Sequence, residues 1–239
     1  NGKINLLIGT HALFQKKVLF KNLGLVIIDE QHKFGVRQRL ELAYKGGNDC
    51  DILLMSATPI PRTLILTLYG DMDVSRLIEK PANRKKTITL SKPEEKISEV
   101  LPFLKKQISM SNQVFWVCPL IEESKNFDYA AAVKKYELLT KKFSKKVGLI
   151  HGGLAKDEKE SVLKKFLNKS IDILVSTTVI EVGIDFPNAN VIVIENSNKF
   201  GLSQLHQLRG RVGRGVNQGT CILLFKKNLS ENAKKRIKI

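Results

Sequence analysis

Short apolar runs typical of β-strands alternate with helical patterns along most of the chain. In the N-terminal part the pattern predicts strands at residues 4–10, 23–30 and 51–58, and a helix at residues 61–70. In the remainder it predicts helices at residues 94–108, 129–143 and 157–167, and strands at residues 113–121, 146–153, 172–178, 190–196 and 220–225. Strands and helices that take turns in this way predict an α/β fold, with parallel sheets covered by helices on both faces.

Two such domains are expected, because 239 residues exceed what one small domain needs. Residues 79–95 carry two prolines and a cluster of charged side chains, a composition typical of a linker. We therefore place the boundary near residue 83, with a first domain at residues 1–82 and a second at residues 83–239.

The charge of the chain indicates a polyanionic partner. Lys and Arg number 40 against 23 Asp and Glu, and the net charge of +17 favours nucleic acid over the plain alternative of solubility. The three cysteines form no C-x-x-C pair, which favours core packing in a reducing cytoplasm over disulfides or zinc. No apolar run approaches the roughly 20 residues of a membrane span. A chain that begins with Asn1 rather than methionine suggests a piece of a longer protein.

Polar motifs end four of the predicted strands, directly after their apolar residues. In open parallel sheets, ligands bind beyond the carboxyl ends of the strands, so these residues are candidates for binding sites. They are Asp29–Glu30, Ser56–Ala57–Thr58, His151–Gly152–Gly153 and Thr177–Thr178.

Two adjacent acids, Asp29 and Glu30, end the apolar run Leu25–Ile28. Neighbouring side chains at the end of a strand point to opposite faces, so the two carboxylates can do different work. One can hold Mg²⁺ while the other orients or deprotonates an attacking water. A polar turn would explain the acids alone, but Gln31 and His32 after them favour a nucleotide site.

A second cluster of candidate residues contains Arg209, Arg211 and Arg214, with Gly210 and Gly213 between them. Guanidinium groups match phosphate oxygens in pairs, and glycines allow close approach of the backbone. Such an arginine can stabilise the charge of a transferring γ-phosphate. A basic surface helix that binds nucleic acid is the alternative.

Five motifs, in order along nearly the whole chain, resemble those of superfamily 2 helicases of the RecG-like branch. "DEQH" at 29–32 resembles the Walker B motif, "SATPIPRT" at 56–63 motif III and "IGTHAL" at 8–13 motif Ib. "STTVIEVGID" at 176–185 resembles motif V, and "QLHQLRGRVGRG" at 204–215 resembles motif VI. The resemblance implies two RecA-like domains, the first one incomplete, that use ATP and Mg²⁺.

The resemblance also implies a role for each matching residue. It implies that the catalytic residues are Asp29, Glu30, Arg211 and Arg214, and that Asp29 and Glu30 also bind Mg²⁺. Nucleotide contacts fall to Gln31, His32, Gly183, Asp185 and Gln207, and coupling of hydrolysis to movement to Ser56, Ala57 and Thr58. DNA contacts fall to Thr10, His11, His151, Gly152, Thr177 and Thr178. Structural histidines, a turn role for Asp185 before Pro187 and a capping role for Thr58 remain alternatives.

By this resemblance the intact protein is an ATP-dependent DNA helicase that acts as a monomer in the bacterial cytoplasm, on the nucleoid. It is expected to remodel stalled replication forks and to branch-migrate Holliday junctions in DNA repair and recombination. A G-x-x-x-x-G-K-[ST] phosphate loop is absent from the sequence, so we expect negligible ATP hydrolysis by this chain alone. A duplex translocase like the transcription-repair coupling factor and a non-catalytic DNA-binding fragment are the alternatives.

Overall fold

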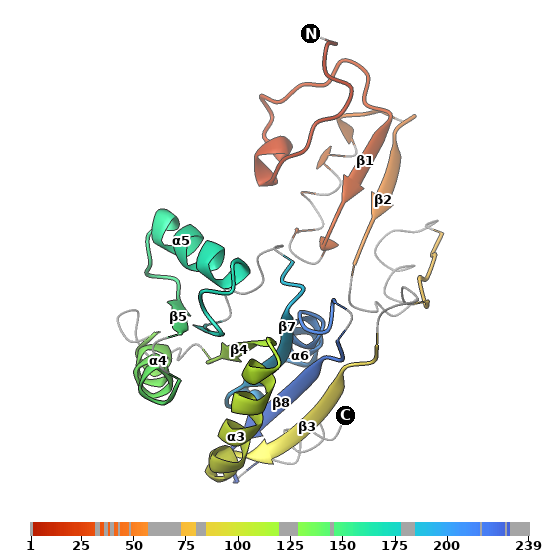
Figure 1. The fold of residues 1–239 in the computed structure, drawn as a ribbon. Coiled ribbons are helices and arrows are strands. Elements are labelled where there is room, and N and C mark those ends of the chain that lie inside the picture. Colours follow the sequence, from red (N-terminus) through yellow and green to blue (C-terminus); the bar gives the residue numbers. More distant parts are fainter. Residues whose placement is uncertain are drawn as a thin grey trace. The chain divides into compact units, whose positions relative to one another are not determined.

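The computed structural model describes residues 2–31, 34, 35, 38, 41, 42, 44–47, 49–56, 73–79, 85–119, 129–143, 146–177, 185–215, 217–227 and 229. The chain forms two compact units, residues 1–75 and 76–239 (Figure 1). The domain boundary predicted near residue 83 falls among residues 80–84, which lie outside the described residues.

The first unit is organised by a parallel pair of strands. Strand β1 (Leu25–Ile28) pairs with β2 (Asp51–Leu54), and Leu25 lies opposite Asp51 in the register. Val26 and Ile28 are buried, whereas the alternate positions of β1 are about half exposed. One face of β1 therefore packs into a small core with Leu42, as the two-residue period of a strand requires.

The strand predicted at residues 4–10 is wrong. Residues 4–10 have no strand conformation, and a 3₁₀ helix, η1 (His11–Phe14), follows them. Ile4, Leu6 and Ile8 are largely exposed, so this apolar run has no partner strand within the described residues. The helix predicted at residues 61–70 lies outside the described part of the chain.

The second unit contains a six-stranded sheet in which every neighbouring pair is parallel (Figure 1). Its strand order is β3-β8-β7-β4-β6-β5. The strands are β3 (Ile88–Pro93), β4 (Gln113–Val117), β5 (Val147–Ile150), β6 (Ile173–Ser176), β7 (Ala189–Ile194) and β8 (Thr220–Phe225). Strands β4, β6 and β7 are buried along their whole length, which explains their continuous apolar sequences.

Helices cover both faces of this sheet. Their bounds are α3 (Ile97–Ser109), α4 (Ala130–Lys142), α5 (Lys156–Leu167) and α6 (Leu202–Arg209), with short 3₁₀ helices η3 (Glu94–Lys96) and η5 (Ser197–Lys199). Side chains of α3 and α4 share one core cluster with Trp116, and side chains of α5 and α6 share another with Phe115. The predicted sheet with helices on both faces is confirmed. Within the described residues, no helix is long and apolar enough to cross a bilayer.

Strand β3 corrects the linker prediction, because it lies inside residues 79–95. It pairs with β8 over six residue pairs, from Ile88↔Thr220 to Pro93↔Phe225. The charges and prolines around it obscured a strand signal in Thr87–Leu90, where β-branched and apolar residues occur in succession. The part of this segment that runs from Ile88 to Pro93 is therefore an edge of the sheet.

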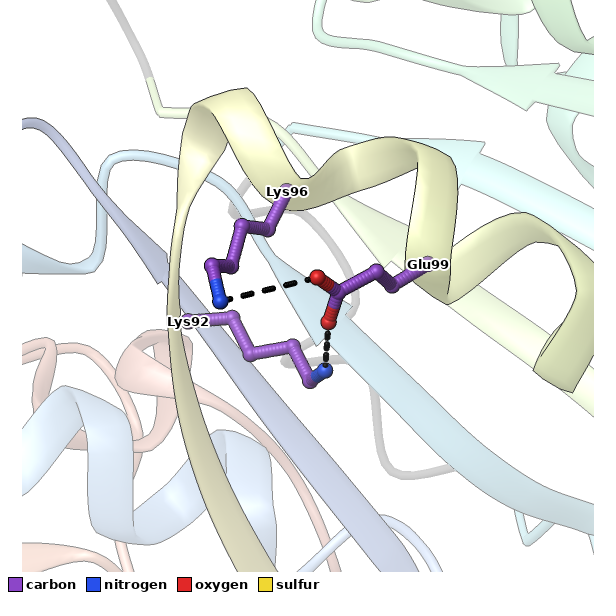
Figure 2. Close-up of polar contacts among 3 residues, drawn as sticks. All are labelled: Lys92, Lys96 and Glu99. Carbon is purple, nitrogen blue, oxygen red and sulfur yellow. Dashed lines mark hydrogen bonds and ion pairs between the residues drawn. The ribbon is translucent and has the colours of Figure 1, made fainter.

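The junction between β3 and α3 is held by charged side chains (Figure 2). Lys92 Nζ lies 2.6 Å from a Glu99 carboxylate oxygen, and Lys96 Nζ lies 3.6 Å from the other oxygen. The hydrogen bond from Lys92, and then the positive charges of both lysines, lower the pKa of Glu99. Because Lys96 and Glu99 are exposed and Lys92 is partly exposed, this contact orients the first turn of α3 more than it stabilises the fold.

Candidate functional site

Asp29, Glu30 and Gln31, which we call the acid turn, follow β1 directly. The Asp29 Oδ1 atom accepts a hydrogen bond from the Glu30 backbone N–H at 2.8 Å. Glu30 has a φ of 49°, in the left-handed region that a non-glycine residue adopts at a cost of about 1 kcal/mol or more. Gln31 is buried. The turn thus places Asp29 at the surface and Gln31 in the interior.

The acid turn fits a magnesium ion that is bound together with a nucleotide. Carboxylate oxygens are preferred Mg²⁺ ligands, and in nucleotide sites one or two carboxylates serve together with phosphate oxygens and water. Asp29 and Glu30 are such a pair, and no cluster of three or more metal-binding side chains occurs in the described part of the chain. Asp29 and Glu30 therefore match the one or two carboxylate ligands that a protein supplies to a magnesium ion bound with a nucleotide.

The structure links the acid turn to the end of β2. The Gln31 N–H donates to the Met55 carbonyl at 3.1 Å, and the Met55 N–H donates to the Ile28 carbonyl at 2.8 Å. Ser56, the first predicted coupling residue, follows Met55 directly and is partly buried. His32, a predicted nucleotide contact, and Ala57 and Thr58, the other predicted coupling residues, lie outside the described residues.

Thr10 and His11, predicted DNA contacts, lie at the start of η1 and are exposed. The Thr10 carbonyl accepts the Leu13 N–H at 3.1 Å, while its hydroxyl makes no capping bond. The imidazole of His11 lies 4.4 Å from the ring of Phe34, between centroids. The segment therefore presents two polar side chains on a short helical turn.

His151 and Gly152 follow β5, as predicted, but they differ in exposure. Gly152 is exposed, whereas His151 is 9% exposed and stacks on Tyr129 at 4.3 Å between ring centroids, with planes 11° apart. Burial, and then the charge of Lys159, lower the pKa of His151. The Lys159 ammonium donates to the Gly152 carbonyl at 3.0 Å. The imidazole is thus buried and stacked on Tyr129, and a direct DNA contact by His151 stays a prediction.

Residues of motif V occupy the end of β6. The side chain of Thr177 is fully buried, and so is that of Ser176 before it. Thr178 and Gly183 lie outside the described residues. A contact between the Thr177 hydroxyl and DNA stays a prediction, and in this structure the hydroxyl does not reach the surface.

Asp185 and Arg214 are brought together by the fold of the second unit. The Arg214 Nη1 atom lies 3.5 Å from Asp185 Oδ1, and the Arg214 Nε–H donates to the Gly210 carbonyl at 3.3 Å. Gln207 lies on α6 and Arg211 follows its end, and both are partly buried. One predicted motif V residue, Asp185, and one predicted motif VI residue, Arg214, therefore lie in contact.

Arg209 works differently from its neighbours. Its Nη2 atom donates to the Thr87 carbonyl at 3.0 Å, so it ties α6 to the residue before β3. Nearby, Gly213 has a φ of 68°, and a Cβ added to it would lie 2.8 Å from the Gly219 nitrogen. This glycine therefore allows the chain to pack against itself, in a place where the sequence suggested approach to phosphate.

Sequence patterns did not indicate one buried polar cluster near the ends of β4 and β7. Lys135 Nζ lies 2.6 Å from Glu195 Oε1, and both side chains are less than 20% exposed. The Cys118 thiol donates to the other Glu195 oxygen at 3.5 Å, and Lys135 lies 5.2 Å from the centre of the Trp116 ring. Burial, and then the negative charge of Glu195, raise the pKa of Cys118. The Lys135–Glu195 pair fastens α4 to the end of β7.

Two family models match the chain, and several curated proteins are similar to it. The model of the helicase conserved C-terminal domain matches residues 93–216, and that of DEAD/DEAH box helicases matches residues 1–66. The ATP-dependent DNA helicase RecG of Thermotoga maritima is 52% identical over 240 residues, which span 100% of this chain and 30% of the relative. The protein of the same name from Bacillus subtilis is 50% identical over 100% of this chain and 35% of its own length.

Solved structures show the same fold. A structure of RecG bound to a three-way DNA junction has a TM-score of 0.75 and 48% identity, over 100% of this chain and 30% of that chain. A structure of S. cerevisiae Dbp5 bound to RNA and ADP BeF3 has a TM-score of 0.66 over 95% of this chain and 60% of that chain, and at 18% identity it shows the fold alone. The predicted RecA-like α/β fold is confirmed, and the chain spans about a third of the length of its curated relatives.

Proposed function

Because the chain belongs to the proteins that carry the helicase conserved C-terminal domain, we propose that it forms part of an ATP-dependent DNA motor of RecG type. The observation that carries the proposal is identity of about half of all residues, over the whole chain, to relatives that bear that name. The acid turn and the pairing of Asp185 with Arg214 support it, because they supply acidic and basic groups suited to a nucleotide with its magnesium ion.

In this proposal each charged residue has its own task. ATP supplies a phosphoanhydride bond, and Mg²⁺ neutralises the charge of its phosphates. Asp29, which is exposed, would hold the ion, and Glu30 would accept a proton from the attacking water at a carboxylate oxygen. Arg214 stabilises negative charge on the γ-phosphate, and its bonds to Gly210 and Asp185 hold the guanidinium in place. Arg211 assists it, and Gln31 and Gln207 contact the nucleotide.

The proposed substrate is branched DNA, such as a stalled fork or a Holliday junction. The net charge of +17 suits a polyanion, and a relative of 48% identity was solved on a three-way DNA junction. Thr10, His11 and Gly152 are the described candidates that are exposed enough to meet a DNA backbone. The protein would act as a monomer on the nucleoid of a bacterial cell.

The test is a chimera in which this chain replaces the matching segment of the Thermotoga maritima relative, so that the remaining regions are supplied. ATP hydrolysis is measured with forked DNA, with linear duplex and without DNA, beside the unmodified relative. We expect stimulation by forks, and a loss of about a hundredfold or more in Glu30→Gln, as for removal of a general base. Glu137→Gln, an exposed position on α4, is the matched control and keeps full activity.

Three outcomes separate the candidate functions. Stimulation by linear duplex alone would favour a translocase like the transcription-repair coupling factor. A chimera that binds DNA but shows no DNA-stimulated hydrolysis, beside an active relative, would overturn the motor proposal and leave a DNA-binding fragment. For this chain alone, without a phosphate loop in its sequence, we expect negligible hydrolysis.

A further inference from the structure

Three rings from two distant parts of the first unit form a cluster. The His11 and Phe34 centroids lie 4.4 Å apart with planes inclined by 32°, and Phe14 and Phe34 lie 5.2 Å apart. His11 and Phe14 themselves are 6.0 Å apart. These separations lie within, or at the short edge of, the range in which aromatic rings attract each other beyond simple burial. Phe34 is therefore the ring from outside η1 that contacts both rings of that helix.

The other side of Phe34 is tied to the acid turn. Its backbone N–H donates to the Gln31 carbonyl at 3.1 Å, and the Gln31 N–H donates to the Met55 carbonyl at 3.1 Å. Gln31, at the centre of this short chain of hydrogen bonds, is 7% exposed. Backbone hydrogen bonds thus connect Phe34 to Gln31, and Gln31 to Met55, the residue before Ser56.

The segment that carries His11 is fixed at a second point by Lys45. The Lys45 ammonium donates to three backbone carbonyls, those of Leu13 at 3.0 Å, Gln15 at 2.6 Å and Val18 at 3.0 Å. An ammonium group has three protons, so these three bonds satisfy it completely. The chain after η1 is thus anchored through its backbone, and the His11 ring rests on Phe34.

We propose that Phe34 is a positioning residue that links the DNA contact of His11 to the nucleotide contact of Gln31. The inference rests on the proposed function, which gives those two roles to His11 and Gln31. A DNA backbone that binds His11 holds its ring against Phe34, and the Phe34–Gln31 bond then holds the acid turn. Phe34 touches neither ligand, and it acts through the two residues that do.

A purely structural role for Phe34 predicts something different. Phe34 also packs against the core of Val26, Ile28 and Leu42, and so does Phe20. If core packing were its whole contribution, Phe34→Leu and Phe20→Leu would both lower stability and leave DNA affinity alone. Phe20→Leu is therefore the matched control.

The first experiment uses this chain as it is, with a short fluorescein-labelled DNA duplex and anisotropy at one fixed salt concentration. We expect His11→Ala to weaken binding about tenfold, as for loss of a hydrogen bond to a charged group. We expect Phe34→Leu to weaken DNA binding by a similar factor. The double variant, His11→Ala with Phe34→Leu, binds no more weakly than either single variant. Phe34→Tyr keeps an aromatic ring and binds as the unmodified chain does. The inference would be overturned if the double variant lost affinity by the product of the two single losses. Unchanged DNA affinity in Phe34→Leu would also overturn it.

The second experiment follows hydrogen exchange at the Gln31 and Phe34 amides, both of which are donors in the chain of bonds above. Saturating duplex slows both amides in the unmodified chain, and this slowing is lost in Phe34→Leu and kept in Phe20→Leu. If the exchange rates of both amides stayed the same when the duplex bound, the link between His11 and Gln31 would be refuted. Failure of the inference leaves the fork-stimulated ATP hydrolysis of the chimera unaffected, so the two proposals fail separately.

Discussion

The side chain of Gln113 offers a direct test of how the second unit is held together. It is 2% exposed, and its Nε2 atom donates to the Phe166 carbonyl at 2.6 Å and to the Ile171 carbonyl at 2.7 Å. These bonds tie the start of β4 to the end of α5 and to the residues before β6. Gln113→Met keeps a similar shape and removes both donor protons.

The magnitude follows from what each carbonyl retains. The Phe166 carbonyl also accepts the Lys169 N–H at 3.1 Å and keeps that partner in the variant. Loss of its bond from Gln113 therefore costs about 1 kcal/mol, the net contribution of one hydrogen bond. The Ile171 carbonyl loses its Gln113 donor, at a cost of about 1–3 kcal/mol for a buried unsatisfied group. The sum is about 2–4 kcal/mol, or a fall of about 10 °C in Tm for a unit of this size.

Trp116 makes the assay specific to this unit, because it is the one tryptophan of the chain and lies fully buried on β4. Its fluorescence during heating reports the second unit alone. Gln218→Met is the control, since the Gln218 amide donates to the Lys86 carbonyl at 3.2 Å on the exposed surface, where water replaces it. Equal losses in both variants, or no loss in Gln113→Met, would refute the reasoning.

Three further outcomes are expected. Burial and a neighbouring lysine lower the pKa of His151 below 6.5, so the folded chain binds fewer protons and its stability is lost as the pH falls below that value. The fall in Tm from about pH 7.5 to about pH 5.5 is therefore larger in the unmodified chain than in His151→Phe. Burial raises the pKa of the Cys118 thiol, so in the folded chain a chromogenic disulfide labels the partly exposed Cys50 first, and mass spectrometry of the labelled peptides checks the order. Arg209→Lys keeps the charge but loses the planar donor to Thr87, and urea unfolding should show a loss of about 1 kcal/mol; unchanged stability would contradict this.

Strands that are buried on both faces were predictable from the sequence. Residues 220–225 were expected as a strand and form β8 with the same bounds, because an uninterrupted run of uncharged, mostly apolar residues suits the interior of a parallel sheet. Residues 4–10 have a similar composition and are not a strand. An apolar pattern shows that a segment suits a sheet, whereas a strand also requires a neighbour to pair with.

The positions of the polar motifs after β1, β2, β5 and β6 were also predictable, because the ends of parallel strands are where ligands bind. Contacts between residues far apart in the chain were not. Arg209 was grouped with the other arginines, yet its donor group reaches a carbonyl 122 residues away. The bond from Phe34 to Gln31 is local, but nothing in its sequence indicates that the His11 ring lies on its other side.

The parallel pairing of β3 with β8 has a mechanical consequence (Figure 1). The chain enters this sheet at Ile88 and leaves it at Phe225, and because the two strands run in the same direction these points lie at opposite ends of the ladder. Tension between them pulls the strands along their axes in opposite senses. All hydrogen bonds of the six residue pairs then carry the load together, in shear, and none can be peeled open before the next. The pair at this edge of the sheet is thus placed to resist stretching along the chain.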